Sequence, residues 1–522
     1  MSIQRALLST WDKTGLDTFA RRLVELGIEV VSTGGTRQAL ELAGLTVTEV
    51  GTLTGRPEAF GGRMKTLSFE ICSALLFERD RDAVEATELG IKAIDLVVCN
   101  LYPFEEHAAR GLPLPELIEY IDVGGPTMIR AAAKNFRHVT VLVDPADYAG
   151  VVEEIAAHGN TLPETRARLA SKAFARTAAY DVAIASHLAE TRGDMAVYEA
   201  RTASEELRYG ENPHQPARVF PPARADAALR FEVLGGKELS YNNYLDLQAA
   251  LDAVVDLPVP SVAVVKHGNP CGLASAAGAG ESLRLAWAGD PVSAFGSVIA
   301  ASAPLSLDDV TFLALDAADR SQRKFVEIVA APAFSADALA YLRQHKSLRI
   351  LAVDPHSGRS DVERRYVRGL VLVQAADRTL HEKLEIVSTH KPALDEELVR
   401  FGLVAVRQVK SNAVVIVGRT AAGACRLLGM GSGQPNRKDS VQLASMRAHE
   451  HLAREAQGAL ISDAILVSDA FFPFADGVEI ALDSGVRTIV QPGGSLRDSE
   501  VVAACDARSA VLVLTGTRHF LH

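Results

Sequence analysis

The sequence predicts an α/β protein of at least two domains, in which short strands alternate with helices. Three observations support this fold class. Apolar runs alternate with helical patterns through the first third of the chain, a long helical stretch at Leu162–Thr191 has no Gly and no Pro beyond Pro163, and apolar runs resume from about residue 200. The alternation in the first third implies a parallel sheet with helices on both faces, whose ligands bind beyond the carboxyl ends of the strands.

The elements of the first domain follow from this alternation. Strands are expected at Arg5–Ser9, Ile28–Ser32, Leu45–Val50, Ala93–Cys99 and His138–Val143. Helices are expected at Gly15–Glu25, at Thr36–Ala43, after Gly125 and at Leu162–Thr191. The polar, weakly patterned stretch Arg192–Arg208 predicts a boundary between domains of residues 1–197 and 198–522.

The second domain alternates again. Strands are expected at Val262–Lys266, Ser297–Ala300, Ile328–Ala330, Leu348–Ala352, Val404–Val406, Ala413–Val417, Ala464–Ser468, Thr488–Gln491 and Ala510–Leu514. A short similarity between Ser293–Phe295 and Ser468–Phe471 hints at two related halves.

Composition bounds the class of protein. The 522 residues suffice for about two to four domains, and the net charge of −11 argues against a broad nucleic-acid surface. Five widely spaced cysteines without a CxxC pair predict reduced thiols. The start lacks the apolar core of a signal peptide, and no apolar run is long enough to span a membrane. We therefore expect a cytoplasmic protein without a membrane partner.

Three segments of the first domain are suited to bind an anion. Ser32–Thr36 places two glycines and flanking hydroxyl groups between a strand and a helix, where free N–H groups attract phosphate. Asp12–Gly15 follows the first strand, and Gly61–Thr66 combines glycines with two cations. A tight turn with a Thr cap would explain the first segment alone, but the three together favour phosphate binding. No Walker A pattern occurs, so a P-loop NTPase is disfavoured.

Polar groups also follow later strands. Asn100–Phe104 comes directly after an apolar strand, and Asp122–Gly125 precedes a helix that carries Arg130 and Lys134. In the second domain, Val265–Gly272 delivers Lys266 and His267 to a turn, and such a pair is a credible acid–base unit. Simple packing of Tyr102 is the plainer explanation for the first segment, and helix capping with a solvated face is the plainer explanation for the second.

Metal chemistry is not expected. A zinc deaminase needs PCxxC, whereas Pro270-Cys271-Gly272 lacks the second Cys. The segment His449-Glu-His451 does not have HExxH spacing.

Taken together, the motifs resemble the PurH family of bifunctional purine biosynthesis proteins, which join phosphoribosylaminoimidazolecarboxamide formyltransferase to IMP cyclohydrolase. They run in order over nearly the whole chain. The matching segments are Lys13–Gly15, Ser32–Thr36, Gly61–Thr66, Asn100–Phe104, Asp122–Gly125, Ala131–Asn135, Arg208–Gln215, Lys266–Gly272, Ser293–Gly296, Lys410–Asn412, Ser468–Phe474 and Arg518–Phe520.

The resemblance implies an N-terminal methylglyoxal-synthase-like parallel-sheet domain with the cyclohydrolase activity. It implies a C-terminal transformylase domain of two cytidine-deaminase-like α/β units without zinc. The family forms an intertwined homodimer with transformylase sites across the subunit interface. The substrate would be AICAR and the co-substrate 10-formyltetrahydrofolate, which give FAICAR and then IMP plus water without a catalytic metal.

The resemblance also implies roles for particular residues. In formyl transfer, Lys266 and His267 would move the proton and Asn412 would position the reacting groups. Nucleotide and folate contacts would come from Arg208, Tyr209, Phe295, Gly296, Glu327, Phe471 and Arg518. In ring closure, the acid–base group would be Lys65, Tyr102, Asp122 and Lys134. Nucleotide contacts there would come from Thr10, Lys13, Ser32, Gly35, Thr36, Arg63, Thr66 and Asn100.

Two departures from the family pattern fall in the first domain. Ser68-Phe69 stands where the family usually has His-Pro, and Trp11 replaces a small residue. Ser68-Phe69 leaves open a monofunctional formyltransferase whose N-terminal domain only binds nucleotide. An alternative from another class is a regulatory nucleotide-binding module fused to an inactive deaminase-like domain.

Overall fold

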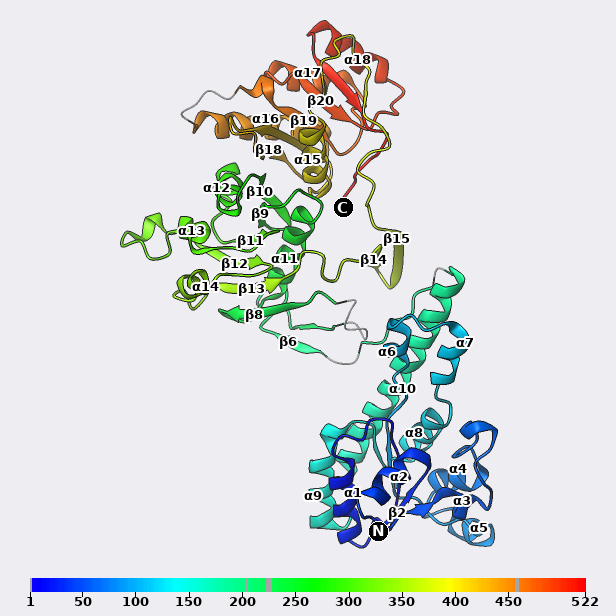
Figure 1. Ribbon diagram of the computed structural model, residues 1–522. Helices are drawn as coiled ribbons and strands as arrows, with labels where there is room; N and C mark the ends of the chain where they lie inside the picture. The colour runs from blue at the N-terminus through cyan, green and yellow to red at the C-terminus, as the bar shows by residue number, and fades with distance from the viewer. Residues whose placement is uncertain (1, 195, 202–203, 222–227, 456–459) are drawn as a thin grey trace. The chain divides into compact units, whose positions relative to one another are not determined.

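The computed structural model describes residues 2–522 except 195, 202–203, 222–227 and 456–459 (Figure 1). The chain divides into two compact units, treated separately below. Unit 1 holds Met1–Ser204 and a short stretch that begins at Phe220, and unit 2 holds Glu205–Val219 and the rest of the chain. Residues 195 and 202–203 of the predicted boundary stretch lie outside the described residues. Within the described ranges, no helix has the length and apolarity that crossing a membrane requires.

Unit 1 contains a five-stranded sheet in the order β3-β2-β1-β4-β5, and each neighbouring pair runs parallel. The strands are β1 (Arg5–Ser9), β2 (Glu29–Ser32), β3 (Thr48–Glu49), β4 (Leu96–Cys99) and β5 (Thr140–Leu142). The predicted parallel sheet is therefore confirmed. The third strand is shorter than predicted because Val50 already begins helix α3 (Val50–Thr54).

Helices cover both faces of this sheet. In β1, Ala6 and Leu8 face a core formed with α1 (Leu16–Glu25) and α9 (Tyr148–His158). Leu7 faces the opposite core, formed with α4 (Phe69–Leu76), α8 (Gly124–Lys134) and α10 (Pro163–Arg192). This alternation is the period of a strand that is buried on both sides. The remaining α-helices of unit 1 are α2 (Gly34–Leu42), α5 (Ala83–Glu88), α6 (Phe104–Ala109) and α7 (Leu114–Leu117).

Unit 2 is built on a twelve-stranded sheet in the order β16-β21-β20-β19-β17-β18-β10-β9-β11-β12-β13-β8. Its strands are β8 (Phe231–Gly235), β9 (Ser261–Lys266), β10 (Asn269–Ser275), β11 (Ser297–Ala301), β12 (Val326–Ala331), β13 (Arg349–Val353), β16 (Glu385–Ile386), β17 (Val414–Arg419), β18 (Cys425–Gly431), β19 (Ile465–Ser468), β20 (Thr488–Gln491) and β21 (Val511–Leu514). Two smaller sheets pair β6 (Glu205–Leu207) with β7 (Ala217–Val219), and β14 (Val362–Val367) with β15 (Leu370–Ala375).

The large sheet consists of two halves with the same topology. From the centre outward, one half reads β10-β9-β11-β12-β13-β8 and the other reads β18-β17-β19-β20-β21-β16. In each half an antiparallel hairpin is followed by three mutually parallel strands and one antiparallel edge strand. The halves join through antiparallel pairing of β10 with β18. The hint of two related halves is thus supported by strand order and direction.

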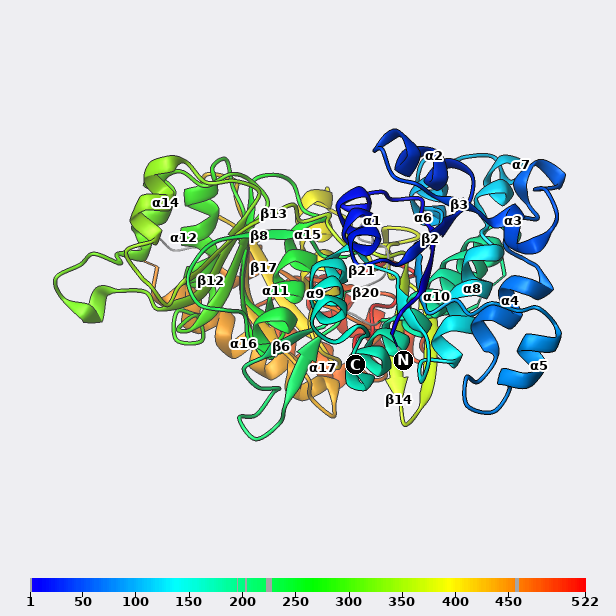
Figure 2. The same cartoon turned by 90° about the horizontal axis from the view of Figure 1, so that it is seen from below.

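The helices of unit 2 follow the same repeat (Figure 1, Figure 2). On one face, α11 (Tyr241–Val254) and α15 (Glu396–Arg407) share a single core that spans both halves. The other face has two separate cores. The first contains α12 (Ala279–Gly289), α13 (Leu307–Val310) and α14 (Ala336–Leu342), and the second contains α16 (Arg437–Ala453), α17 (Ala475–Asp483) and α18 (Asp498–Ala507).

One predicted strand is wrong, because Val404–Val406 belongs to helix α15. Every residue from Leu398 to Arg407 except Arg400 is buried, so the apolar run has no polar face that would reveal a helical period. Strands β10 and β18 were not predicted, because glycines interrupt their apolar runs.

Glycines in these two hairpin strands allow helices to pack closely on the sheet. A Cβ on Gly272 of β10 would lie 1.7 Å from Ala286 O in α12. A Cβ on Gly429 of β18 would lie 2.1 Å from Ala444 O in α16. Both neighbours are backbone atoms, which cannot move aside without displacing a helix. In both halves, therefore, a helix packs closely on the sheet at a glycine of the corresponding hairpin strand.

We expect Gly272→Ala to lower the free energy of unfolding by about 2–4 kcal/mol, because the added methyl group must push α12 off the sheet. Urea unfolding of the full-length chain measures this loss. Gly150→Ala is the control, since a Cβ there meets nothing within 4 Å on helix α9. Equal stability of the two variants would contradict the expected clash.

Candidate functional sites

The first candidate site lies at the carboxyl ends of the parallel strands in unit 1. The Thr36 hydroxyl donates to Thr10 O at 2.9 Å and accepts from Thr10 N at 3.0 Å. The Ser32 hydroxyl donates to Leu8 O at 2.7 Å. These two predicted residues hold the loops in place, whereas the buried Thr10 Oγ1 has no hydrogen-bond partner among the described atoms. Thr10 thus retains a hydroxyl group for a ligand.

The amino end of α2 provides an electropositive position in this site. The helix begins at Gly34 and contains the predicted Gly35 and Thr36 in its first turn. Gly34 has φ +45°, and a Cβ there would lie 3.1 Å from Lys65 Nζ. Lys65 therefore lies beside free backbone N–H groups, an arrangement that favours a bound phosphate or oxyanion. Its ammonium group is 3.5 Å from Glu58 Oε2.

Asp122 and Tyr102 are the residues of this site that the sequence predicts for acid–base chemistry. Asp122 Oδ1 accepts from Gly125 N at 2.8 Å. Burial raises the pKa of Asp122, although this hydrogen bond and the charge of Lys65 oppose the shift. Burial also raises the pKa of Tyr102, and the charge of Asp122 adds to it. A buried carboxyl group with a raised pKa, on which the charge of Lys65 acts, is a candidate for proton transfer. Thr66 adjoins this group, because a Cβ on Gly124 would lie 2.9 Å from Thr66 Oγ1.

Other predicted residues of unit 1 lie apart or have structural partners. Lys134 is the exposed last residue of α8, about 15 Å along the helix from Gly124. Within one chain, the structure does not bring Lys134 to the Lys65–Tyr102–Asp122 group. Arg63 is exposed and pairs with Glu119. Lys13 Nζ donates to Trp11 O at 3.2 Å. The roles of these residues stay predictions.

Asn100 supports the loop after β1. Its Oδ1 accepts from Trp11 N at 2.6 Å and from Asp12 N at 3.0 Å, and its Nδ2 donates to Asp12 O at 2.8 Å. The side chain thus joins the loops after two neighbouring strands. Sequence reasoning identified Asn100 by its place after a strand, but not this function.

The second candidate site surrounds the β9–β10 turn of unit 2. Lys266 Nζ donates to Phe295 O at 2.5 Å and to Gly296 O at 3.2 Å. Gly296 has φ +71°, and a Cβ there would lie 2.9 Å from Lys266 Nζ. Only glycine therefore fits this contact without strain. The predicted Lys266, Phe295 and Gly296 lie together.

His267 occupies a strained and accessible position. Its φ is +52°, a value that costs a non-glycine residue free energy and that clusters at functional sites. His267 is exposed at the tip of the β9–β10 turn. The next amide, Gly268 N, donates to Asp246 Oδ1 at 2.7 Å. Burial raises the pKa of Asp246. Sequence reasoning missed Asp246, because helix α11 gives no sign that it contacts a distant turn.

Glu327 belongs to a polar group on strands β12 and β13. Its Oε2 accepts from Asn243 Nδ2 at 2.8 Å and lies 3.8 Å from Arg349 Nη1. Asn243 and Arg349 were not predicted as site residues. Asn243 also closes the capping box of α11.

Asn412 is held from three sides. Its Oδ1 accepts from Arg437 Nη2 at 2.8 Å, and its Nδ2 donates to Gln434 O at 2.9 Å and Pro435 O at 3.2 Å. Arg437 also pairs with the fully buried Asp469. The amide plane of Asn412 is therefore fixed by the protein before any ligand binds.

The other residues of unit 2 that were predicted to contact the nucleotide or folate make fewer contacts with the rest of the site. The exposed Arg208 guanidinium lies 5.5 Å from the ring centre of Tyr209. The exposed Arg518 lies 4.4 Å from the ring centre of Phe520. Phe471 is half-buried. Two exposed arginines can bind an anionic group, but the described contacts do not link them to Lys266.

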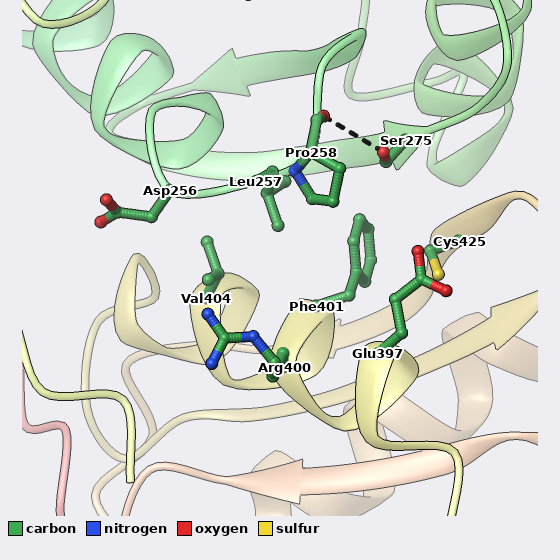
Figure 3. Close-up of a pocket in the computed structure, with 9 residues that line it drawn as sticks. All are labelled: Asp256, Leu257, Pro258, Ser275, Glu397, Arg400, Phe401, Val404 and Cys425. Atoms are coloured by element: carbon green, nitrogen blue, oxygen red, sulfur yellow. Dashed lines mark hydrogen bonds between the residues drawn. The ribbon is translucent and has the colours of Figure 1, made fainter.

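A cavity of 270 Å³ lies between the two halves of unit 2 (Figure 3). Leu257, Pro258, Phe401 and Val404 form its apolar walls, and Ser275 Oγ donates to Pro258 O at 3.3 Å. Ser275 ends β10, whereas Asn269 at the start of that strand pairs with Lys266. The cavity is therefore separate from the β9–β10 turn and contains no predicted site residue.

Comparisons with known proteins cover both units. The family model described as AICARFT/IMPCHase bienzyme matches residues 132–447, and the MGS-like domain model matches residues 15–127. The second match confirms the methylglyoxal-synthase-like prediction for the N-terminal domain, whereas the cytidine-deaminase-like detail stays a prediction.

Curated relatives match along their whole length. The bifunctional purine biosynthesis protein PurH of Parvibaculum lavamentivorans is 44% identical over 538 residues, which cover 100% of this chain and 97% of that protein. Proteins of the same name from Elusimicrobium minutum and Acidithiobacillus ferrooxidans are each 42% identical, over 100% of this chain and 99% of theirs. The crystal structure of ForH is 39% identical, covers 36% of this chain and 100% of that chain, and has a TM-score of 0.32, too low to support an argument.

Proposed function

The chain belongs to the AICARFT/IMPCHase bienzyme family, and from this premise we propose which residues carry each of its two reactions. It catalyses the last two steps of purine biosynthesis, formyl transfer to AICAR and ring closure of FAICAR to IMP. We assign ring closure to unit 1 and formyl transfer to unit 2. The observation that carries this assignment is the separate acid–base group in each unit, Lys65 with Asp122 and Lys266 with His267.

In ring closure, the carboxamide nitrogen of FAICAR attacks the formyl carbon, and water leaves from the resulting tetrahedral carbon. Lys65, beside the amino end of α2, would stabilise negative charge on the former formyl oxygen. Asp122 would accept the proton of the attacking nitrogen, because burial raises its pKa toward the range of a useful base. Tyr102 would donate one proton to this oxygen and Asp122 would return the proton that it accepted, so that the oxygen leaves as water. As the ring C=N bond forms, the formamide nitrogen loses its own proton, which would reprotonate Tyr102. No cofactor is needed for this balance.

In formyl transfer, the weakly nucleophilic amine of AICAR attacks the formyl carbon of the co-substrate. His267 would remove the amine proton, and Lys266 would place its positive charge beside the imidazole. His267 would then return this proton to the folate nitrogen as the bond from the formyl carbon to that nitrogen breaks, which gives tetrahydrofolate and FAICAR. Asn412, with its amide plane fixed, would orient the reacting groups. Family membership supports a folate-derived donor, and we propose 10-formyltetrahydrofolate.

A homodimer is part of the proposal. The β14–β15 hairpin forms a separate two-stranded sheet, on which the exposed fractions of Tyr366, Leu370 and Leu372 are 66%, 65% and 54%. Such a hairpin gains little stability alone in water, and a second chain would cover its apolar side chains. Sedimentation equilibrium should give twice the chain mass of 55.7 kDa. A single species at the chain mass would contradict the dimer.

The coupled reaction tests the assignment. Purified protein supplied with AICAR and 10-formyltetrahydrofolate should produce IMP, and protein supplied with FAICAR alone should produce IMP faster than the spontaneous reaction. Formyl transfer without accelerated ring closure would instead support the monofunctional alternative. That alternative rests on Ser68-Phe69, of which Ser68 caps helix α4 by accepting from Ile71 N at 3.1 Å.

Asp246 should position His267. We expect Asp246→Ala to lower kcat of formyl transfer about 10–100-fold with little change in KM, because the left-handed turn loses the acceptor for Gly268 N. Asp246→Asn keeps an acceptor oxygen and should recover much of the rate. Ring closure in unit 1 is the internal control. A parallel loss of both activities would show unfolding and would contradict a positioning role.

A further inference from the structure

Trp11 presents a large aromatic surface at the edge of the unit 1 site. The side chain is 48% exposed, although it follows directly on the buried Thr10. Its ring meets Tyr102 edge-on at 5.2 Å between centroids and Tyr120 at 6.5 Å. Tyr120 in turn stacks on His107 at 3.7 Å. The indole is thus the outermost ring of an aromatic group that contains a proposed proton donor of ring closure.

Trp11 is exposed although the loop that carries it is held by hydrogen bonds. Asn100 Oδ1 accepts from Trp11 N at 2.6 Å, and Lys13 Nζ donates to Trp11 O at 3.2 Å. The next residue, Asp12, binds Thr14 N at 2.9 Å and Thr14 Oγ1 at 2.7 Å. The loop is therefore rigid on both sides of Trp11. A fixed aromatic ring loses little entropy when a ligand covers it.

Nothing in the ring-closing chemistry uses this indole, and burying it in the core would have gained hydrophobic free energy. Its free surface adjoins Tyr102, which lies close enough to Asp122 and Glu58 for their charges to raise its pKa. A ligand held by Lys65 and the amino end of α2 would have its heterocycle near these groups. Flat heterocycles bind well on exposed aromatic faces.

We propose that Trp11 is a specificity-determining residue of the unit 1 site, whose indole stacks on the heterocycle of the bound purine nucleotide. This inference rests on the proposed ring-closing function of unit 1. The bicyclic purine of the product offers a larger flat face than the monocyclic imidazole of the precursor. Trp11 therefore binds IMP, and the ring-closing transition state that resembles it, more tightly than FAICAR.

The two tryptophans of the chain allow a direct test. Trp287 is 8% exposed in the core of unit 2, so in Trp287→Phe the remaining emission comes from Trp11. Titration of this variant with IMP should quench the emission with the same midpoint that calorimetry gives for binding. Unchanged emission while calorimetry shows IMP bound would overturn the stacking proposal and leave ring closure in unit 1 intact.

Substitution of Trp11 supplies the second measurement. Trp11→Ala should weaken IMP binding about tenfold and ribose 5-phosphate binding hardly at all, since ribose 5-phosphate has no heterocycle to stack. Trp11→Phe keeps an aromatic face and should restore most of the IMP affinity. Equal weakening for both ligands would place the indole on the sugar phosphate and overturn the proposal. Absence of both IMP binding and ring closure in the unsubstituted protein would instead contradict the proposed function of unit 1.

Discussion

Lys266→Ala should reduce formyl transfer about 10³-fold and leave ring closure of supplied FAICAR unchanged. The ammonium group uses two of its three protons on Phe295 O and Gly296 O, which leaves the third for the reacting groups beside His267. Alanine removes that proton and the positive charge beside His267. It also leaves two carbonyl groups without their donor.

Lys266→Arg is the matched control for charge. The longer, planar guanidinium cannot reproduce the contact beside Gly296, so it should recover little activity although it is cationic. Steady-state rates for AICAR with 10-formyltetrahydrofolate, and separately for FAICAR, measure both effects. Retention of formyl transfer within tenfold by Lys266→Ala would remove Lys266 from the reaction.

Lys65→Ala should show the opposite pattern, with ring closure reduced about 10²-fold or more and formyl transfer unchanged. Lys65 Nζ lies against the first turn of α2. We propose that the helix N–H groups and the ammonium charge there act on the same oxygen of the substrate. Its charge also counters the burial that raises the pKa of Asp122. In Lys65→Ala, the acidic limb of any residual ring-closing activity should therefore move to higher pH.

Mixing the two variants provides a control that neither gives alone. Protein with Lys65→Ala still makes FAICAR, and protein with Lys266→Ala still closes its ring. The mixture should therefore convert AICAR to IMP, whereas each variant alone should accumulate FAICAR or leave AICAR unchanged. Loss of both activities in either folded variant would contradict independent sites in the two units.

Several residues of the candidate sites were predicted from their position at the end of a strand. Lys266 follows an apolar run that is a buried strand, and the structure brings it to Phe295 and Gly296 from another strand end. Lys65, Tyr102 and Asp122 likewise meet in unit 1. In unit 1 such residues can be recognised because parallel strands place their carboxyl ends at a common edge. Lys266 instead meets the residues that precede β11, because β9 and β11 run antiparallel.

Supporting residues gave no comparable signal. Asp246 lies within helix α11, and Arg437 begins helix α16, yet each holds a proposed site residue from another segment. The buried run Val404–Val406 was taken for a strand because a helix that is covered on nearly all sides lacks a polar face. In both cases the missing information is the neighbour, which no local pattern contains.

The sequence by itself determined the α/β class, most strands and the polar groups at their ends, because periodicity and strand–helix order depend on residues close together in the chain. Only the tertiary structure decided that the large sheet of unit 2 repeats one topology about the β10–β18 pair, and that Asn100 and Asp246 hold loops from other segments. It also placed Lys134 at the far end of α8 from Asp122. These arrangements depend on contacts between distant residues, whose free energy is gained only when the chain packs.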